Sequence, residues 1–293
     1  HRLLLRQCGI ETVNLYTAFL ALAILRMEPG GEIVAIIPRS FCNGTYYRPF
    51  RKLLLDHCAI QQIHLFEARD KAFADDAVLQ ENIIIKLVRG EEQSAVVVSD
   101  CRDGEFSDYR QRSLSFQQIV HSGDPELFIH IPAFEPQDAV VSPLFAATLK
   151  DVGLDVCTGP VVDFRLRQHC SAELGTDDVP LLYAHHFPEG LLSFPSGHKK
   201  KPNAIANNEQ TRKWLMPRGN YVLIRRFSAK EERRRVVAFV LEEKDLPTPC
   251  VGFENHLNVI HEGRRGLDLE TARGLAAFLN STLVDACFRA FSG

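Results

Sequence analysis

The sequence predicts an α/β protein, and its first forty residues carry most of that prediction. Ten of the eleven residues in Leu15–Leu25 are apolar or aromatic, as expected for a helix buried between a sheet and a second layer. Asn14 is a candidate N-cap for this helix, and Pro29-Gly30-Gly31 ends it. Ile33–Ile37 then has the composition of a short buried strand, so helix and strand together form half of a βαβ unit.

The next sixty residues continue the alternation of helices and strands. Apolar residues from Tyr46 to Leu54 recur at helical spacing and predict a helix that runs to His57. Later segments predict strands at 60–66, 83–88 and 95–98, the last of them at an edge of the sheet. This order of elements is typical of a sheet with helices packed on it.

The second half of the chain predicts a separate domain. The pattern weakens from 102 to 139, where several prolines fall, and this stretch is expected to be a linker. From residue 140 we expect a mixed α/β domain with a helix around 144–150 and short strands at 180–184, 221–224 and 235–241. Asp268 is a candidate N-cap for one closing helix. The apolar face of that helix would hold Ala272, Leu275, Phe278, Leu279, Leu283 and Cys287.

Composition excludes several classes of protein. With 293 residues, of which 45% are hydrophobic and 24% charged, the chain is long enough for two ordinary globular domains. Its longest apolar run stops at Arg26, short of the ~20 residues that cross a bilayer, so no membrane partner is expected. The eight cysteines form no C-x-x-C pair, so we expect no metal site, no disulfides and a cytoplasmic protein. The chain opens at His1 without methionine, and we expect it to be a piece of a longer protein.

Positive charge is concentrated in one region of the sequence. Residues 185–235 hold twelve Lys and Arg against four Asp and Glu, whereas the rest of the chain has a net charge of −11. Such a region favours a polyanionic partner, and we expect contacts with DNA phosphates, although a solvated surface is the alternative. The candidate DNA-binding residues are Lys199, Lys200, Lys201, Arg225, Arg226, Lys230, Arg233, Arg234 and Arg235.

Seven segments carry a family resemblance that spans nearly the whole chain. They are NLY at 14–16 with Phe19, PGGE at 29–32, PRSFCNG at 38–44, VLQENIIIKL at 78–87, YVLIRRFSAKEERRR at 221–235, ENHLN at 254–258 and FRAFSG at 288–293. Together they resemble adenine-N6 DNA methyltransferases of type II restriction-modification systems, above all the Eco57I-type methylases of the PstI/BsuBI kind. The longer strings are the more specific ones, because short pieces such as PGG occur in many helix–turn–strand units.

The resemblance implies a division into three parts. Residues 1–101 would form the C-terminal half of a Rossmann-like methyltransferase sheet, 102–139 a linker and 140–293 a mixed α/β target-recognition domain. The implied cofactor is S-adenosylmethionine, and the implied partner is double-stranded DNA. The implied reaction is methyl transfer to the N6 amine of an adenine flipped out of the duplex. A cognate restriction endonuclease would act in the same system without direct contact.

Two aromatic residues match functional positions of the family. Phe19 corresponds to the ring that packs against the adenine of S-adenosylmethionine, whereas its helix alone would suggest a core residue. Phe73 corresponds to the ring that stacks on the flipped target adenine, which needs a replacement π-surface. The following Ala74-Asp75-Asp76 departs from the family's aromatic-Pro motif. Phe66 is therefore the alternative for the stacking role.

Two motifs of the family are missing from the sequence. No Pro-Pro pair and no G-x-G loop occur, so the NPPY-type tetrapeptide and the glycine-rich cofactor cradle are absent. In the family both lie upstream of the NLY segment. We therefore expect the C-terminal portion of a site-specific adenine-N6 DNA methyltransferase, inactive alone. The alternative is a non-catalytic DNA-binding or specificity subunit that works beside a partner chain carrying the missing motifs.

Overall fold

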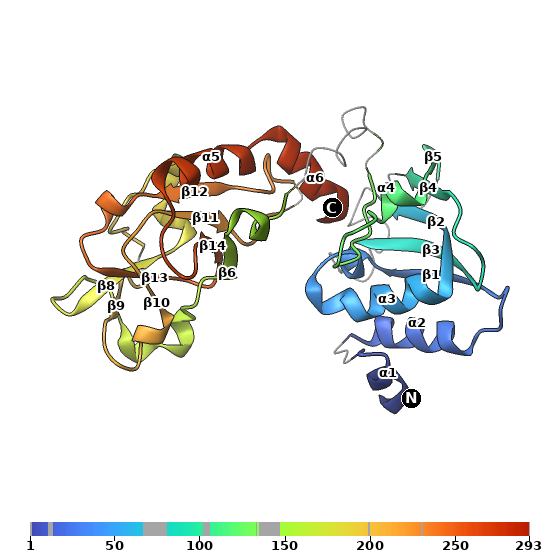
Figure 1. The fold of residues 1–293 in the computed structure, drawn as a ribbon, viewed down its shortest axis with the longest axis horizontal. Helices are drawn as coiled ribbons and strands as arrows, with labels where there is room; N and C mark the ends of the chain where they lie inside the picture. Colours follow the sequence, from blue (N-terminus) through green and yellow to red (C-terminus); the bar gives the residue numbers. More distant parts are fainter. Residues whose placement is uncertain are drawn as a thin grey trace. The chain divides into compact units, whose positions relative to one another are not determined.

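The computed structural model describes residues 2–10, 14–66, 81–101, 106–132, 134, 147–198, 200–229 and 231–292. The chain divides into two compact units (Figure 1). The first comprises His1–Ser142 with Cys287–Gly293, and the second comprises Pro143–Ala286. Both units combine helices with sheets, so the prediction of a mixed α/β protein is confirmed.

A five-stranded mixed sheet forms the centre of the first unit, in the order β1-β3-β2-β4-β5. Its strands are β1 (Glu32–Pro38), β2 (Cys58–Phe66), β3 (Asn82–Arg89), β4 (Val96–Cys101) and β5 (Arg110–Leu114). β2 and β4 are parallel, and the other neighbouring pairs are antiparallel. The strands predicted at 33–37, 60–66 and 83–88 are therefore confirmed.

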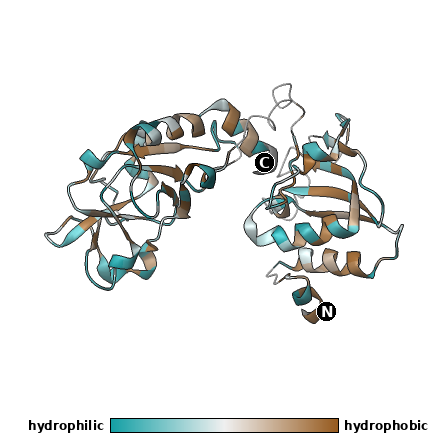
Figure 2. Cartoon of the chain, in the orientation of Figure 1, coloured by the Kyte–Doolittle hydropathy of each residue, from teal (hydrophilic) through white to brown (hydrophobic). Residues whose placement is uncertain are grey.

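Helices α2 (Leu15–Arg26) and α3 (Arg48–His57) pack on this sheet, and the short α1 (Arg2–Gln7) precedes them. Leu20 and Ile24 of α2 and Leu54 of α3 are buried in one core with strand residues such as Ile63 and Ile85. Figure 2 shows α2 as largely hydrophobic along its length. β1 is less buried than the sequence predicts, because Val34 and Ile36 are 67% and 58% exposed.

Two local predictions around these helices are corrected. Asn14 occupies the N-cap position of α2, but its side chain makes no capping hydrogen bond. Its amide donates instead to the Tyr47 hydroxyl at 2.5 Å. The helix predicted from Tyr46 begins at Arg48, since both tyrosines belong to a preceding 3₁₀ turn, η2 (Thr45–Tyr47). Pro49 suits this start, because the first-turn N–H that proline lacks would have no helical acceptor.

The strand predicted at 95–98 is β4, and it lies inside the sheet rather than at its edge. β5 pairs antiparallel with β4 and takes the edge position. Both β5 and the helix α4 (Phe116–Ile119) fall within the stretch 102–139 predicted as a linker. β5 has the sequence RQRSL and is mostly exposed, so only its backbone pairing identifies it as a strand.

Two sheets make up the second unit. The first has the order β12-β11-β14-β6. Its strands are β6 (Asp155–Thr158), β11 (Tyr221–Arg225), β12 (Ala238–Leu241) and β14 (Leu257–His261). The second has the order β10-β13-β8-β9-β7. Its strands are β7 (Cys170–Ser171), β8 (Asp178–Leu182), β9 (Ala204–Ala206), β10 (Leu215–Pro217) and β13 (Cys250–Phe253). Residues of both sheets, including Leu182, Tyr221, Leu223 and Phe253, share a core.

The predicted closing helix is two helices, α5 (Leu269–Leu279) and α6 (Thr282–Ser292). The Asp268 carboxylate accepts from the Thr271 N–H at 3.0 Å, so the predicted N-cap is confirmed. The helix breaks at Asn280, whose side chain hydrogen-bonds to the backbone of Ala238 in β12. The single apolar face predicted for this region is therefore divided, and Phe278 is 44% exposed.

Three remaining expectations concern local structure and composition. Of the helix predicted around 144–150, residues 147–149 are not helical, and 144–146 lie outside the described residues. A 3₁₀ turn, η6 (Lys150–Val152), follows. All eight cysteines are free thiols. Within the described ranges, no helix is both long and apolar enough to cross a membrane.

Candidate functional sites

Phe19 lies on the outer face of α2. Its side chain is 70% exposed, and Leu15, one turn earlier, is 74% exposed. The opposite face of α2 is the buried one, with Leu20, Ala21 and Ile24 in the core. The alternative that Phe19 is a core residue is therefore not supported by the described residues. An exposed aromatic ring beside a second exposed apolar residue is suited to contact with another molecule or segment.

A hydrogen-bonded polar cluster lies where β1 ends and α2 begins. The Tyr16 hydroxyl lies 3.0 Å from the Ser40 hydroxyl, and Ser40 donates to the Tyr47 hydroxyl at 3.4 Å. Asn14 donates to the same Tyr47 oxygen. Burial raises the pKa of Tyr16, so its phenol is neutral at physiological pH. The cluster offers uncharged hydroxyl and amide groups at the carboxyl end of a strand, where ligands commonly bind in α/β sheets.

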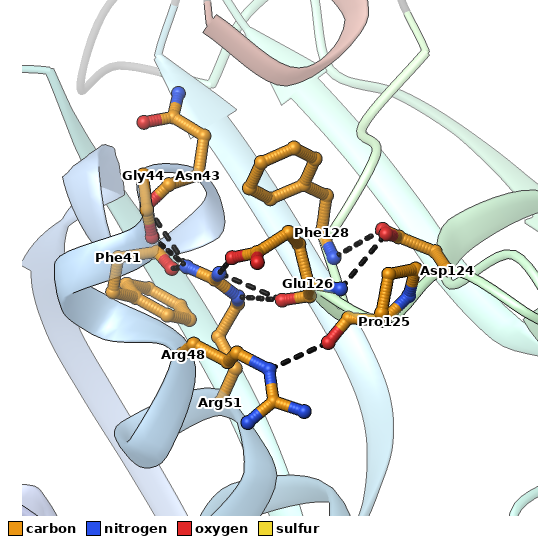
Figure 3. A network of polar contacts seen from close by, with 9 residues as sticks. All are labelled: Phe41, Asn43, Gly44, Arg48, Arg51, Asp124, Pro125, Glu126 and Phe128. Atoms are coloured by element: carbon orange, nitrogen blue, oxygen red, sulfur yellow. Dashed lines mark hydrogen bonds and ion pairs between the residues drawn. The ribbon is translucent and has the colours of Figure 1, made fainter. Parts of the chain in front are cut away.

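Arg51 of α3 fixes the loop that follows β1 (Figure 3). Its side chain is fully buried, and Nη1 donates to the carbonyls of Phe41, Asn43 and Gly44, each at 2.9 Å. Its Nε and Nη2 donate to the Glu126 carbonyl at 3.1 and 2.7 Å. Burial lowers the pKa of Arg51, although arginine remains charged at physiological pH. One guanidinium thus joins two loops that are far apart in the sequence.

The second of these loops is ordered by Asp124. Its carboxylate oxygens accept from the N–H groups of Glu126 at 2.9 Å and Phe128 at 2.8 Å (Figure 3). Arg48 donates to the Pro125 carbonyl at 2.6 Å, and the Phe128 ring lies 5.1 Å from the Arg51 guanidinium. These contacts hold the Glu126 carbonyl in place for Arg51. The sequence gives no sign of this support, because Asp124 and Arg51 are 73 positions apart.

Phe73 lies outside the described residues, so its role stays a prediction. Phe66, the alternative, is half-buried at the end of β2 and packs edge-on against His64 at 4.8 Å. His64 also stacks on Phe106 and Tyr109 at 5.2 and 5.8 Å. Its ring nitrogens contact Ser99 and Cys101, and burial lowers its pKa. Phe66 thus belongs to an aromatic cluster that sequence reasoning did not identify.

The predicted basic residues near 200 divide between surface and internal contacts. Lys199 lies outside the described residues, and Lys200 is exposed. Lys201 forms an ion pair with Asp163 at 2.7 Å and lies 5.1 Å from the Tyr183 ring. Tyr183 also donates to Asp163 at 3.0 Å. Lys201 therefore stabilises the second unit, and Lys200 is the more accessible of the two described lysines.

The basic residues from 225 to 235 also divide between surface and internal contacts. Arg225 forms an ion pair with Glu232, and Lys230 lies outside the described residues. Arg226 and Arg233 are exposed. Arg234 is half-buried and donates to the Asn280 carbonyl.

Arg235 is the least accessible member of the run, with only 8% of its surface exposed. Its Nε donates to the Ser228 hydroxyl at 3.0 Å, and its backbone N–H donates to Asp285 at 2.5 Å. These bonds hold the turn between β11 and β12. From the sequence alone, the arginines of the run are expected to share one surface. In the structure Arg226 and Arg233 are exposed, whereas Arg235 is buried.

A hollow of about 570 Å³ opens beside this turn. Its lining includes His185, Phe187, Arg225 and Phe239. The Phe187 and Phe239 rings stack at 5.2 Å, and the buried Nε of Arg225 has no hydrogen-bond partner among the described residues. Among all the described residues, no group of three or more His, Cys, Asp and Glu side chains is placed to hold a metal ion.

Comparison with known proteins finds that the chain is similar to restriction-modification methylases. Residues 6–73 match the model of the Eco57I restriction-modification methylase family. The chain is 50% identical over 294 residues to the type II methyltransferase M.BsuBI of Bacillus subtilis. It is 44% identical over 297 residues to the type II methyltransferase M.PstI of Providencia stuartii. Both alignments cover 100% of this chain and 58% of the relative. The resemblance read from the sequence is therefore confirmed, and the chain spans somewhat more than half the length of these relatives.

Solved structures give weaker likenesses. The type IIL restriction-modification enzyme MmeI in complex with DNA has a TM-score of 0.43 and 10% identity, covering 84% of this chain and 36% of that chain. A DrdV–DNA complex has a TM-score of 0.42 and 11% identity, covering 84% and 31%.

Proposed function

We propose that this chain is the C-terminal portion of a site-specific adenine-N6 DNA methyltransferase of a type II restriction-modification system. The observation that carries the proposal is the identity of 50% and 44%, over the whole chain, to M.BsuBI and M.PstI. The whole protein would act on double-stranded DNA in the cytoplasm and use S-adenosylmethionine. A cognate endonuclease would act in the same system without direct contact.

The first unit would contribute half of a Rossmann-like catalytic domain. The antiparallel pair of β2 and β3 and the helices packed on the sheet support this assignment. Phe19 fits the role of a ring against the adenine of S-adenosylmethionine, since most of its surface is exposed. The glycine-rich cradle is not encoded in these 293 residues, so the rest of the cofactor site would come from elsewhere.

In the reaction, S-adenosylmethionine supplies the methyl group that is transferred directly to the N6 amine. This chain's own residues would position the reactants. The π-face of Phe73 would hold the flipped adenine, with Phe66 as the alternative. Arg51 would keep the loop after β1 in a fixed geometry, because its bonds to three carbonyls constrain residues 41–44. The proposal needs no metal.

The second unit would recognise the target DNA. Arg226, Arg233 and Lys200 are exposed cations on an otherwise acidic chain, which supports phosphate contacts. Lys199 and Lys230 remain candidates outside the described residues. Lys201, Arg225, Arg234 and Arg235 would act chiefly by supporting the surface, given their internal contacts.

The test is methyl transfer from radiolabelled S-adenosylmethionine to plasmid DNA. The product of the complete gene should incorporate label, and nucleoside analysis should find N6-methyladenine. The 293-residue chain alone should incorporate none, because it lacks the tetrapeptide and the cradle. Turnover by the chain alone would contradict the fragment proposal, and label on cytosine would contradict adenine specificity. DNA binding without any methylation by the complete gene product would favour the specificity subunit.

A further inference from the structure

Phe227 is an exposed aromatic residue in the basic turn that follows β11. Its side chain is 59% exposed, although it sits between Arg226 and a run of charged residues. Single exposed apolar residues are common and need no explanation by themselves. What distinguishes Phe227 is that its neighbours orient the ring and leave most of its surface uncovered.

Two side chains flank the ring, and both are themselves anchored. The Arg226 guanidinium lies 5.1 Å from the ring centre, and its Nη1 donates to the Asn255 carbonyl at 3.2 Å. The His256 ring lies 5.5 Å away, and its Nδ1 contacts the Glu254 carboxylate at 2.5 Å. Nucleic-acid bases stack on aromatic side chains, and a nearby arginine adds a cation–π contribution.

The backbone beneath Phe227 is fixed as well. The Arg226 N–H donates to the His256 carbonyl at 2.9 Å, and the Arg225 N–H donates to the Val237 carbonyl at 3.0 Å. Ser228, the next residue, accepts from the Arg235 guanidinium. The ring is therefore preorganised, so little conformational entropy is lost when a flat partner covers it.

We propose that Phe227 stacks on a nucleobase of the bound DNA, at a base step that the turn approaches. This inference rests on the DNA-binding function proposed above. Arg226 beside the ring and Arg233, in the same segment between β11 and β12, are exposed and would contact phosphates. Aromatic side chains that enter a base step unstack it partly and bend the duplex. Phe227 is thus a base-contacting residue of the second unit, separate from the ring that would hold the target adenine.

The test begins with a pool of 30-base-pair duplexes randomised at the centre, enriched by binding to the 293-residue chain. One enriched duplex is then made with 2-aminopurine replacing each adenine in turn. The wild-type chain should change the fluorescence at one position or at two adjacent positions. Phe227→Ala should abolish that change and weaken binding about 5- to 150-fold, the range of one base–aromatic stack. Phe227→Trp should retain both.

Phe164→Ala is the matched control, because Phe164 is also 59% exposed and lies 5.5 Å from an arginine, Arg165. Its affinity and fluorescence should equal those of the wild type. Equal losses in both alanine variants would overturn the assignment, since any exposed ring would then act alike. Unchanged binding and fluorescence in Phe227→Ala would overturn it while leaving the proposed function intact. If neither the wild-type chain nor the product of the complete gene enriches a duplex, the DNA-binding function fails as well.

Discussion

Asn280 hydrogen-bonds to both backbone groups of Ala238: its Nδ2 donates to the carbonyl at 2.9 Å, and its Oδ1 accepts from the N–H at 3.0 Å. Because β12 is an edge strand, this amide takes the place of a neighbouring strand. Asn280→Ala should lower the free energy of unfolding by about 2 kcal/mol, since Ala238 is buried and would keep unpaired groups. Asn280→Asp keeps the acceptor oxygen, so its free energy of unfolding should lie between those of the wild type and Asn280→Ala.

Urea unfolding of the 293-residue chain measures this loss as a lower midpoint. Asn258→Ala is the control, because that amide makes only a 3.4 Å contact with Thr158 in the same sheet. Its loss should stay within about 0.5 kcal/mol. A wild-type midpoint for Asn280→Ala would mean that water replaces the amide.

Arg51→Met should be among the most destabilising changes in the first unit. It leaves carbonyls of four residues without their donor, three of them in the loop after β1. We expect a loss of about 3–5 kcal/mol by urea unfolding. Arg51→Lys should recover only a small part, since one ammonium cannot reach carbonyls on both sides. Arg48→Ala removes one exposed bond, to Pro125, and should cost about 1 kcal/mol. Similar losses of stability in Arg51→Met and Arg48→Ala would show that the buried hydrogen bonds of Arg51 contribute no more than the single exposed bond of Arg48.

The salt dependence of DNA binding separates exposed from buried arginines. If Arg233 contacts one phosphate, Arg233→Gln should reduce the slope of log affinity against log salt by about 1 unit. Arg235→Gln should leave the slope unchanged and lower stability instead, because Arg235 is buried and bonds to Ser228. Arg167→Gln, at an exposed position elsewhere in the second unit, is the control. A slope reduced equally by Arg233→Gln and Arg167→Gln would point to non-specific attraction.

Local patterns in the sequence predict β1, β2 and β3 of the first unit well and the long-range contacts poorly. The apolar runs that predict β1, β2 and β3 involve residues close together in the sequence, so the local pattern is enough to identify these strands. β5 has no such pattern and is defined by pairing with β4. The break between α5 and α6 depends on Ala238, 42 positions from Asn280. Whether an arginine in the 225–235 run faces solvent depends likewise on Asn280, Asp285 and Ser228.

His130 should make the first unit less stable in acid. Its ring stacks on His121 at 4.1 Å, and burial, followed by the charge of His121, lowers its pKa to about 4. The unfolded chain, with a histidine pKa near 6.5, binds the extra proton first as the pH falls. The free energy of unfolding should therefore drop as the pH falls from 6.5 to 4, and His130 should account for up to about 3 kcal/mol of this loss. Above pH 6.5 His130 should make no contribution to the pH dependence of stability. His130→Gln should remove this part of the slope, whereas His57→Gln, at an exposed position, should keep it. Parallel stability curves for wild type and His130→Gln would contradict the assignment.

Variants of Phe19 distinguish a ring that contacts the cofactor from a ring that is merely exposed. In the product of the complete gene, Phe19→Ala should weaken S-adenosylmethionine binding by about 5- to 150-fold, as expected when one adenine–aromatic stack is lost. Phe19→Trp should retain most of the affinity, because any π-face serves. Leu15→Ala is the matched control, because Leu15 has a similar exposure one turn earlier on α2, and it should bind the cofactor normally. Calorimetric titration measures the affinities, and melting temperatures of the 293-residue variants should stay within about 2 °C of wild type, since neither side chain is buried there. Equal affinity in Phe19→Ala and wild type would exclude the stacking role. Loss of affinity in both alanine variants would mean that this face of α2 supports the cofactor site only by packing against the rest of the enzyme.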